Sequence, residues 1–260
     1  MIGLDAILNI AAYKFVELSD AAQWRESIRS QAEALALKGT VLLAGEGINL
    51  VLAGAPDATR HFVAWLHREP RFADIAVKES VCAGMPFQRL RVKLKAEIIR
   101  MNHPTIRPQA RRAPVVDATT LARWLDAGHD DAGRPVVTLD TRNAFEVDRG
   151  RFRGAIDWRI DNFSEFPQAL LAHREALRGK TVVSYCTGGI RCEKAALFMQ
   201  DAGVDHVFQL DGGILKYLEA TGGSHFDGDC FVFDERDALD KTLLPAACPA
   251  GQHSNEVQTT

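Results

Sequence analysis

The 260-residue sequence contains no run of about 18 apolar residues and no basic N-terminal region followed by an apolar core and a small-residue cleavage site. We therefore expect no membrane span and no secretory leader, and we expect the protein to be cytoplasmic. The sequence also has no glycine-rich dinucleotide fingerprint, no Walker loop and no haem attachment pattern. No cofactor is evident from these features.

Cysteine is also scarce. A chain of this length can bury a sizeable core without disulfides, so we expect reduced thiols. Two pairs, His225 with Cys230 and Cys248 with His253, suggest a zinc site, but their spacing is not that of a compact ribbon or finger. We therefore predict no metal site. The cysteines are Cys82, Cys186, Cys192, Cys230 and Cys248.

The net charge of −3 is unevenly distributed. Residues 1–112 carry 16 Lys/Arg against 11 Asp/Glu, a net charge of +5, whereas residues 113–260 carry 15 against 23, a net charge of −8. Apolar and basic residues alternate from position 89 onward, which predicts a strand over 90–99 with cations on one face. Such a face suits the phosphate backbone of a nucleic acid, or docking against the acidic second half of the chain. The cations are Arg89, Arg91, Lys93 and Lys95.

Hydrophobic patterns in the first hundred residues predict the order strand, helix, strand, strand, helix, strand. That is the order of a ferredoxin-like or acylphosphatase-like sandwich, in which helices cover one face of the sheet. We expect the other face to be open. Residues 1–100 would form this first domain.

Residues 101–114 contain three prolines and no periodicity, which predicts a linker. In residues 115–222 strands alternate with helices, which predicts a second domain with a mostly parallel sheet and helices on both faces. Residues 223–260 would form a C-terminal extension with one further strand at 230–233 and a disordered end from 248 onward.

The stretch at 181–202, TVVSYCTGGIRCEKAALFMQDA, is typical of a buried strand that enters a helix through a tight loop. Cys186 follows the strand, where free N–H groups of the loop and of the first helical turn favour an anion. Arg191 adds a positive charge, so we predict a nucleophilic thiolate. A buried structural cysteine is the alternative. The remaining residues of the predicted anion loop are Thr187, Gly188, Gly189, Ile190 and Cys192.

Loop length separates two chemistries. Cysteine phosphatases generally have one residue more between cysteine and arginine than this chain has, and the smaller ring suits the terminal sulfur of a persulfide better than a phosphate. Asp140 and Arg142 end an earlier strand, where they either support the loop or take part in catalysis.

The residues after Arg191 have more than one interpretation. Cys192 is either a resolving thiol for a persulfide or sulfenic acid on Cys186, or a packing residue. Glu193 and Lys194 are interpreted as an exposed helix start.

Six stretches carry a resemblance that extends to about residue 236. They are GTVLLAGEGINLVLAG at 39–54, LRVKLKAEIIRM at 90–101, LDTRNAFEV at 139–147, SYCTGGIRCEKAA at 184–196, QLDGGILKYLE at 209–219 and CFVFDER at 230–236. Together they closely resemble the rhodanese-domain tRNA uridine hydroxylase family. The resemblance implies a rhodanese-like second domain with Cys186 as the essential cysteine.

What the resemblance implies about function is oxygen-dependent conversion of the wobble uridine of tRNA to 5-hydroxyuridine. Molecular oxygen would be the co-substrate, and the basic face would bind tRNA. A persulfide-forming sulfurtransferase, supplied by thiosulfate or a sulfur-donor protein, is the competing function because the same loop would serve it. An RNA-binding module with an inactive loop is a third reading, and the oligomeric state is left open.

Overall fold

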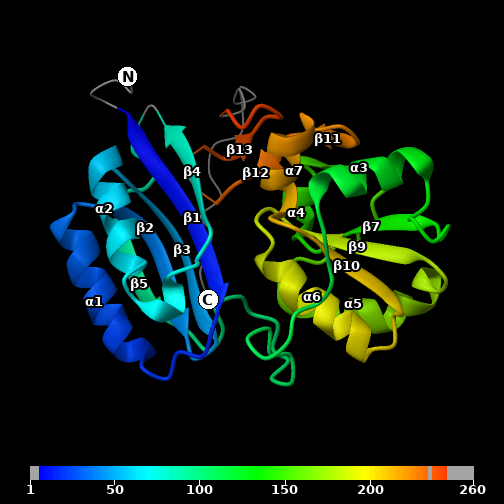
Figure 1. The fold of residues 1–260 in the computed structure, drawn as a ribbon, viewed down its shortest axis with the longest axis horizontal. Helices are drawn as coiled ribbons and strands as arrows, with labels where there is room; N and C mark the ends of the chain where they lie inside the picture. The colour runs from blue at the N-terminus through cyan, green and yellow to red at the C-terminus, as the bar shows by residue number, and fades with distance from the viewer. Residues whose placement is uncertain (1–5, 83, 234–235, 245–260) are drawn as a thin grey trace.

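The computed structural model describes residues 6–82, 84–233 and 236–244, which form two α/β domains side by side (Figure 1). In the first domain the sheet order is β4-β1-β3-β2-β5, and neighbouring strands are antiparallel except for β2 and β5, which are parallel. The elements of this domain are β1 (Ile7–Phe15), α1 (Ala21–Ala34), β2 (Lys38–Ala44), β3 (Gly47–Gly54), α2 (Pro56–Leu66), a 3-10 turn (Pro70–Phe72), β4 (Val77–Cys82) and β5 (Leu90–Leu94).

Alternation along the strands explains how this sheet is covered. Ile10 on β1, Val41 on β2 and Leu50 on β3 point to one face and are buried with Ile28 of α1 and Phe62 of α2. Burial of that apolar face is the main stabilising contribution. The predicted acylphosphatase-like sandwich is confirmed.

The strand predicted over 90–99 is shorter than expected and ends at Leu94. The Lys95 N–H still donates to the Leu43 carbonyl of β2 at 2.8 Å, but further along the chain backbone N–H groups bind carboxylates instead. The N–H of Ile98 donates to Glu46, and Glu97 accepts from the N–H groups of Met101 and Asn102. The chain therefore turns away from the sheet after Leu94.

The second domain has a sheet in the order β6-β10-β9-β7 in which all strands are parallel. Helices α5 and α6 cover one face and α3 and α7 the other, which confirms the predicted rhodanese-like arrangement (Figure 1). The elements are β6 (Val115–Val116), α3 (Ala118–Ala127), β7 (Val136–Asp140), α4 (Ala144–Val147), β8 (Gly150–Phe152), α5 (Phe166–His173) between 3-10 turns (Phe163–Glu165 and Arg174–Leu177), β9 (Thr181–Tyr185), α6 (Ile190–Asp201), β10 (His206–Leu210) and α7 (Gly213–Thr221).

The segments expected as a linker and an extension both pack on the domains. Met101, Ile106 and Ala113 are buried in the core of the second domain. After α7, β11 (Phe226–Gly228) pairs with β8, and β12 (Cys230–Phe231) pairs with β13 (Ala238–Leu239). The end predicted to be disordered, from 248 onward, lies outside the described residues.

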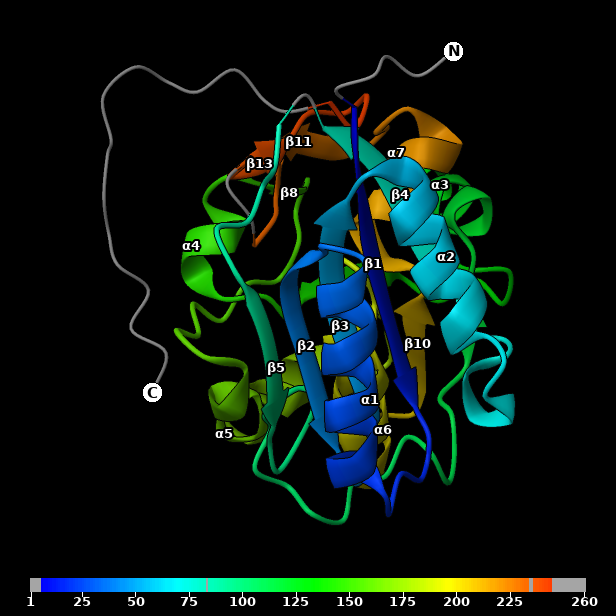
Figure 2. The ribbon, with the colours of Figure 1, turned by 90° about the vertical axis from the view of Figure 1, so that its left-hand side faces the viewer.

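The face of the first sheet that was expected to be open is turned toward the second domain, which lies behind the sheet when α1 and α2 face the viewer (Figure 2). Tyr13 on β1 and Lys78 on β4 contact the second domain from this face, and Arg236 of the extension donates to Ser80 on β4 at 2.8 Å. The expectation of a wholly open face is therefore wrong. Within the described part of the chain, no helix is both long and apolar enough to span a membrane.

Candidate active site

Cys186 lies directly after β9, and α6 begins four residues later. The cysteine loop, residues 186–191, turns at Gly189, whose φ of +104° is a conformation that side chains rarely adopt. The turn points the N–H of Gly189 at the Cys186 sulfur, with an N–Sγ distance of 3.1 Å. The loop therefore offers a hydrogen-bond donor to a thiolate at this position.

A second glycine holds the backbone of the cysteine loop from the α7 side. Gly213 has a φ of +67°, and a Cβ atom there would lie 2.4 Å from the Cys186 carbonyl oxygen. This close approach lets the N–H of Ile214 donate to that carbonyl at 2.9 Å, and the N–H of Leu215 to the Thr187 carbonyl at 3.2 Å. The glycines of QLDGGILKYLE thus shape the cysteine loop.

The electrostatics of Cys186 favour the thiolate. Burial by itself would raise the pKa of the Cys186 thiol, but a hydrogen bond with Cys192, the charge of Arg191 and the N–H groups of Arg191 and Gly189 outweigh it and lower the pKa to about 5. Burial and the neighbouring Cys186 raise the pKa of Cys192. At neutral pH, Cys186 is therefore ionised while Cys192 keeps its proton. The hydroxyl of Thr141 lies 3.8 Å from the Cys192 sulfur.

Arg191 is held by a residue that sequence reasoning did not single out. The guanidinium binds both carboxylate oxygens of Glu146 on α4, at 2.6 and 2.7 Å, and both side chains are buried. Burial would raise the pKa of Glu146, but Arg191 more than offsets this and lowers it. The available signal was the Asn143–Glu146 capping box of α4, in which Glu146 accepts from the N–H of Asn143 at 3.1 Å.

Asp140 and Arg142 form a fully buried ion pair at 2.7 Å. Arg142 also donates to the carbonyl oxygens of Gly150 at 2.6 Å and Glu146 at 3.4 Å. The pair therefore fixes α4 and the start of β8, and so supports Glu146 behind the cysteine loop.

Two side chains of the first domain contact the cysteine loop and the helix that follows it. The Tyr13 hydroxyl donates to Glu193 at 2.9 Å and lies 2.9 Å from the position that a Cβ of Gly189 would take. The Lys78 ammonium donates to the carbonyl oxygens of Gly188, at 3.4 Å, and Gly212.

Each of the two domains matches a known family of domains. A model of the UPF0176 acylphosphatase-like domain matches residues 7–98, and a model of the rhodanese-like domain matches residues 117–220. A tRNA uridine(34) hydroxylase of Bordetella avium is 65% identical and the match covers 92% of this chain and 99% of that protein. The chain belongs to the tRNA uridine(34) hydroxylase family.

Two further relatives carry the same name, and a solved structure was compared with this chain as well. Proteins named tRNA uridine(34) hydroxylase from Bordetella petrii and Variovorax paradoxus are 62% and 61% identical, with 95% and 97% of this chain and 98% and 96% of those proteins covered. A solution structure of a rhodanese-like domain from Anabaena is 21% identical and covers 56% of this chain and 92% of that domain, with a TM-score of 0.38.

In this member of the hydroxylase family, the two residues after CTGGIRC join the domains. Lys194 is 1% exposed, and its ammonium binds Glu46 at 2.8 Å, Glu97 at 2.6 Å and the Ile99 carbonyl at 3.0 Å. The prediction of an exposed helix start is wrong for Glu193 and Lys194, because the first turn of α6 faces the first domain.

The predicted cationic row is only partly in the sheet. Arg91 and Lys93 are half-buried on β5, on the same sheet face as Tyr13, whereas Arg89 and Lys95 are exposed at its ends. Within the described residues, none of these four side chains has a hydrogen bond or ion pair with the cysteine loop. Their role in binding RNA stays a prediction.

The histidine and cysteine residues considered as zinc ligands do not form a metal site in the described part of the chain. His225 Nε2 lies 2.8 Å from Asp126, and the described residues contain no cluster of three or more side chains that could hold a metal ion. Cys248 and His253 lie outside the described residues.

Proposed function

We propose that this chain hydroxylates the wobble uridine of tRNA, position 34, at C5, with Cys186 as the nucleophile. The observation that carries the proposal is the buried Cys186 thiolate, held by the Gly189 N–H in a chain that belongs to the tRNA uridine(34) hydroxylase family. Relatives that carry this name are matched over nearly their whole length.

The chemistry begins at C6 of the uracil ring. A thiolate that adds to C6 moves electron density to C5 and makes C5 nucleophilic toward an oxidant. Cys186 is suited to this step because its pKa is lowered, so that the attacking form is present at neutral pH.

Molecular oxygen, the proposed oxidant, requires two electrons for each turnover. Oxygen captured at C5 leaves a hydroperoxide, which the protonated Cys192 thiol reduces to the hydroxyl group while becoming a sulfenic acid. Loss of the C5 proton releases Cys186 from C6, and Cys186 then condenses with the sulfenic acid to give a disulfide and water. One oxygen molecule and two thiols are thus converted to one C5 hydroxyl, one water and one disulfide, and a cellular thiol resets the pair.

Mass spectrometry of nucleosides tests the function directly. Unmodified tRNA is incubated in air with the wild-type chain, with Cys186→Ser and with Cys82→Ser, which alters a buried cysteine of β4 in the first domain. We expect 5-hydroxyuridine with the wild-type and Cys82→Ser proteins and none with Cys186→Ser. An anaerobic incubation should also give none.

Two results would contradict the proposal. A cysteine-dependent gain of sulfur in place of oxygen would make the chain a tRNA sulfurtransferase. Retained hydroxylation by Cys186→Ser, at equal tRNA binding, would remove Cys186 from the chemistry.

A further inference from the structure

Three phenylalanine side chains, two exposed and one half-buried, form an aromatic group on α4 and the segment of β12. Phe145 on α4 lies 5.1 Å from Phe231 on β12 and 6.4 Å from Phe233, and Phe231 lies 5.1 Å from Phe233, measured between ring centroids. Phe145 is 48% exposed and Phe233 is 59% exposed. We call these three residues the phenylalanine cluster. Aromatic side chains that gather on a surface are a feature of interaction sites, whereas single exposed hydrophobic residues are common.

Both chain segments that carry the cluster also touch the cysteine loop. Phe145 precedes Glu146, whose carboxylate binds Arg191 and accepts from the Thr187 hydroxyl at 3.5 Å. Phe231 follows the buried Cys230, and Thr187 of the cysteine loop offsets part of the rise that burial causes in the pKa of the Cys230 thiol. A group bound on the cluster would therefore be placed close to Cys186 by rigid, buried connections.

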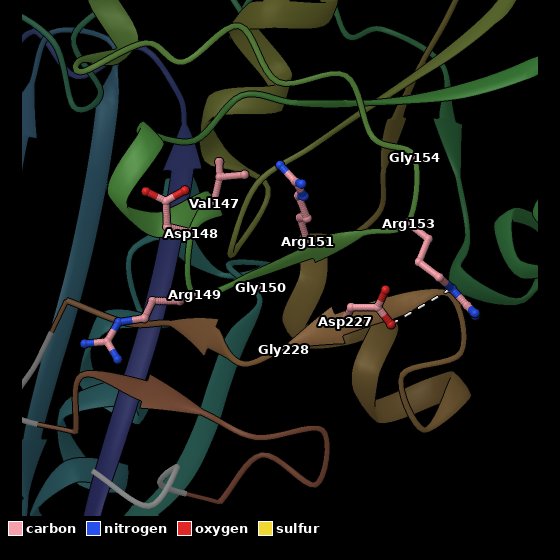
Figure 3. Close-up of a pocket in the computed structure, with 9 residues that line it drawn as sticks. All are labelled: Val147, Asp148, Arg149, Gly150, Arg151, Arg153, Gly154, Asp227 and Gly228. Carbon is pink, nitrogen blue, oxygen red and sulfur yellow. Dashed lines mark ion pairs between the residues drawn. The ribbon is translucent and has the colours of Figure 1, made fainter. Parts of the chain in front are cut away.

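The residues that follow Phe145 and Glu146 in the sequence line a pocket with three arginines. Residues 147–151, 153–154 and 227–228 line a pocket of about 470 Å³ (Figure 3). Arg149 at its edge is paired with Asp237, on the turn between β12 and β13, and Arg153 reaches Asp227 only at 4.0 Å between exposed atoms. Arg151 also lines the pocket and has no ion pair among the described residues, and its side chain runs from β8 toward Val147 (Figure 3). Asp148, which lines the pocket as well, is paired with Arg159. The pocket thus offers a cation to a phosphate.

An aromatic surface beside an unpaired arginine matches the chemistry of single-stranded RNA. Bases stack on aromatic rings while phosphates bind arginine, and proteins that act on one base take it out of the stack. A wobble uridine that reaches Cys186 loses its stacking with the neighbouring bases, which then need new partners.

We propose that the phenylalanine cluster is the platform on which a base adjacent to the reacting uridine stacks, and that Arg151 binds a phosphate of the same strand. The proposal rests on the proposed function for the identity of the RNA. It assigns RNA recognition to the second domain as well as to the cationic row of β5.

Fluorescence anisotropy with a labelled anticodon stem–loop RNA tests the platform at one fixed salt concentration. Phe145→Ala and Phe233→Ala should each weaken binding roughly 5- to 100-fold, the effect of losing a base–aromatic contact. Phe145→Tyr, which keeps the ring, should bind within about twofold of wild type. Leu171→Ala is the matched control, because it removes an exposed apolar side chain on α5, which carries no residue of the phenylalanine cluster.

Abasic RNAs separate stacking from a structural effect. The loss caused by Phe145→Ala should vanish when the base at position 33 or position 35 is absent, because there is then no ring to stack. Arg151→Gln should weaken binding of the intact and abasic RNAs equally and should reduce the salt dependence of binding, since it acts on a phosphate. The same Phe145→Ala loss with every RNA, or no loss with the intact RNA, would overturn the platform.

This experiment can fail independently of the proposed function. Binding is measured whether or not the RNA is hydroxylated, and nucleoside mass spectrometry of the same wild-type reaction reports hydroxylation. Hydroxylation by a protein whose Phe145 and Phe233 variants bind normally would leave the function standing and remove the platform.

Discussion

Replacing the buried Glu146 with glutamine should destabilise this protein far more than replacing an exposed carboxylate at the end of the same helix, α4. Glu146 offsets the charge of Arg191 through two hydrogen bonds at 2.6 and 2.7 Å, and both side chains are buried. Glutamine keeps the shape of the side chain and one acceptor oxygen but removes the negative charge. Arg191 then loses the carboxylate that binds it directly and keeps only the Cys186 thiolate and Asp140 as neighbouring negative charges.

The size of the effect follows from the burial. Breaking a buried ion pair by removing one partner costs about 3–5 kcal/mol. Because the glutamine carbonyl can still accept one bond from Arg191, we expect the lower end, about 3 kcal/mol of unfolding free energy. With a urea dependence of about 1–3 kcal/mol per molar, the unfolding midpoint should fall by at least about 1 M.

Asp148→Asn is the matched control for this measurement. Asp148 binds Arg159 in the same two-bond geometry, at 2.6 and 2.9 Å, but the side chains are 60% and 52% exposed. Pairs in solvent contribute little, so the urea midpoint of this variant should be almost unchanged. Equal midpoint shifts for the two variants, by circular dichroism at equal protein concentration, would refute the reasoning that burial of the Arg191–Glu146 pair sets its importance.

Three further predictions concern the thiols, the domain contact and the cationic row. The alkylation rate of Cys186 by iodoacetamide should be constant above about pH 6 and fall as the pH drops through about 5, because the thiolate is lost there. Cys192→Ala should move the midpoint of this pH dependence to higher pH, because it removes a hydrogen bond that lowers the Cys186 pKa. A wild-type midpoint near the ordinary cysteine value would contradict the described site. Lys194→Met should leave the carboxylates of Glu46 and Glu97 without their shared cation and so speed cleavage by trypsin in limited proteolysis. An unchanged cleavage rate would show that this contact does not hold the domains together. Arg91→Gln and Lys93→Gln should each lower the slope of log affinity against log salt for tRNA by about 1, and equal slopes would exclude phosphate contacts at those positions.

Much of the fold and the position of Cys186 between a strand and a helix could be predicted because their signals are local. The run of apolar residues before Cys186 and the helical spacing after it are properties of neighbouring residues, and so is the glycine turn between them. The same holds for the order of elements in the first domain.

The parts that could not be predicted depend on contacts between distant residues. Glu146 lies 45 positions before Arg191, and Glu46 lies 148 positions before Lys194. A charged residue at the start of a helix has the same local pattern whether it faces water or another domain. The early end of β5 has the same origin, because the Ile98 N–H, which a longer strand would have used, donates to Glu46, 52 positions before it.

Lys194 also limits how this protein can be divided. A fragment that begins after the first domain would keep the ammonium at the start of α6 and lose both carboxylates that neutralise it, together with the Tyr13 hydroxyl beside the cysteine loop. A fragment that ends before residue 101 would likewise lose the cation between Glu46 and Glu97. The two halves are therefore best expressed as one chain, because each supplies charges that neutralise those of the other.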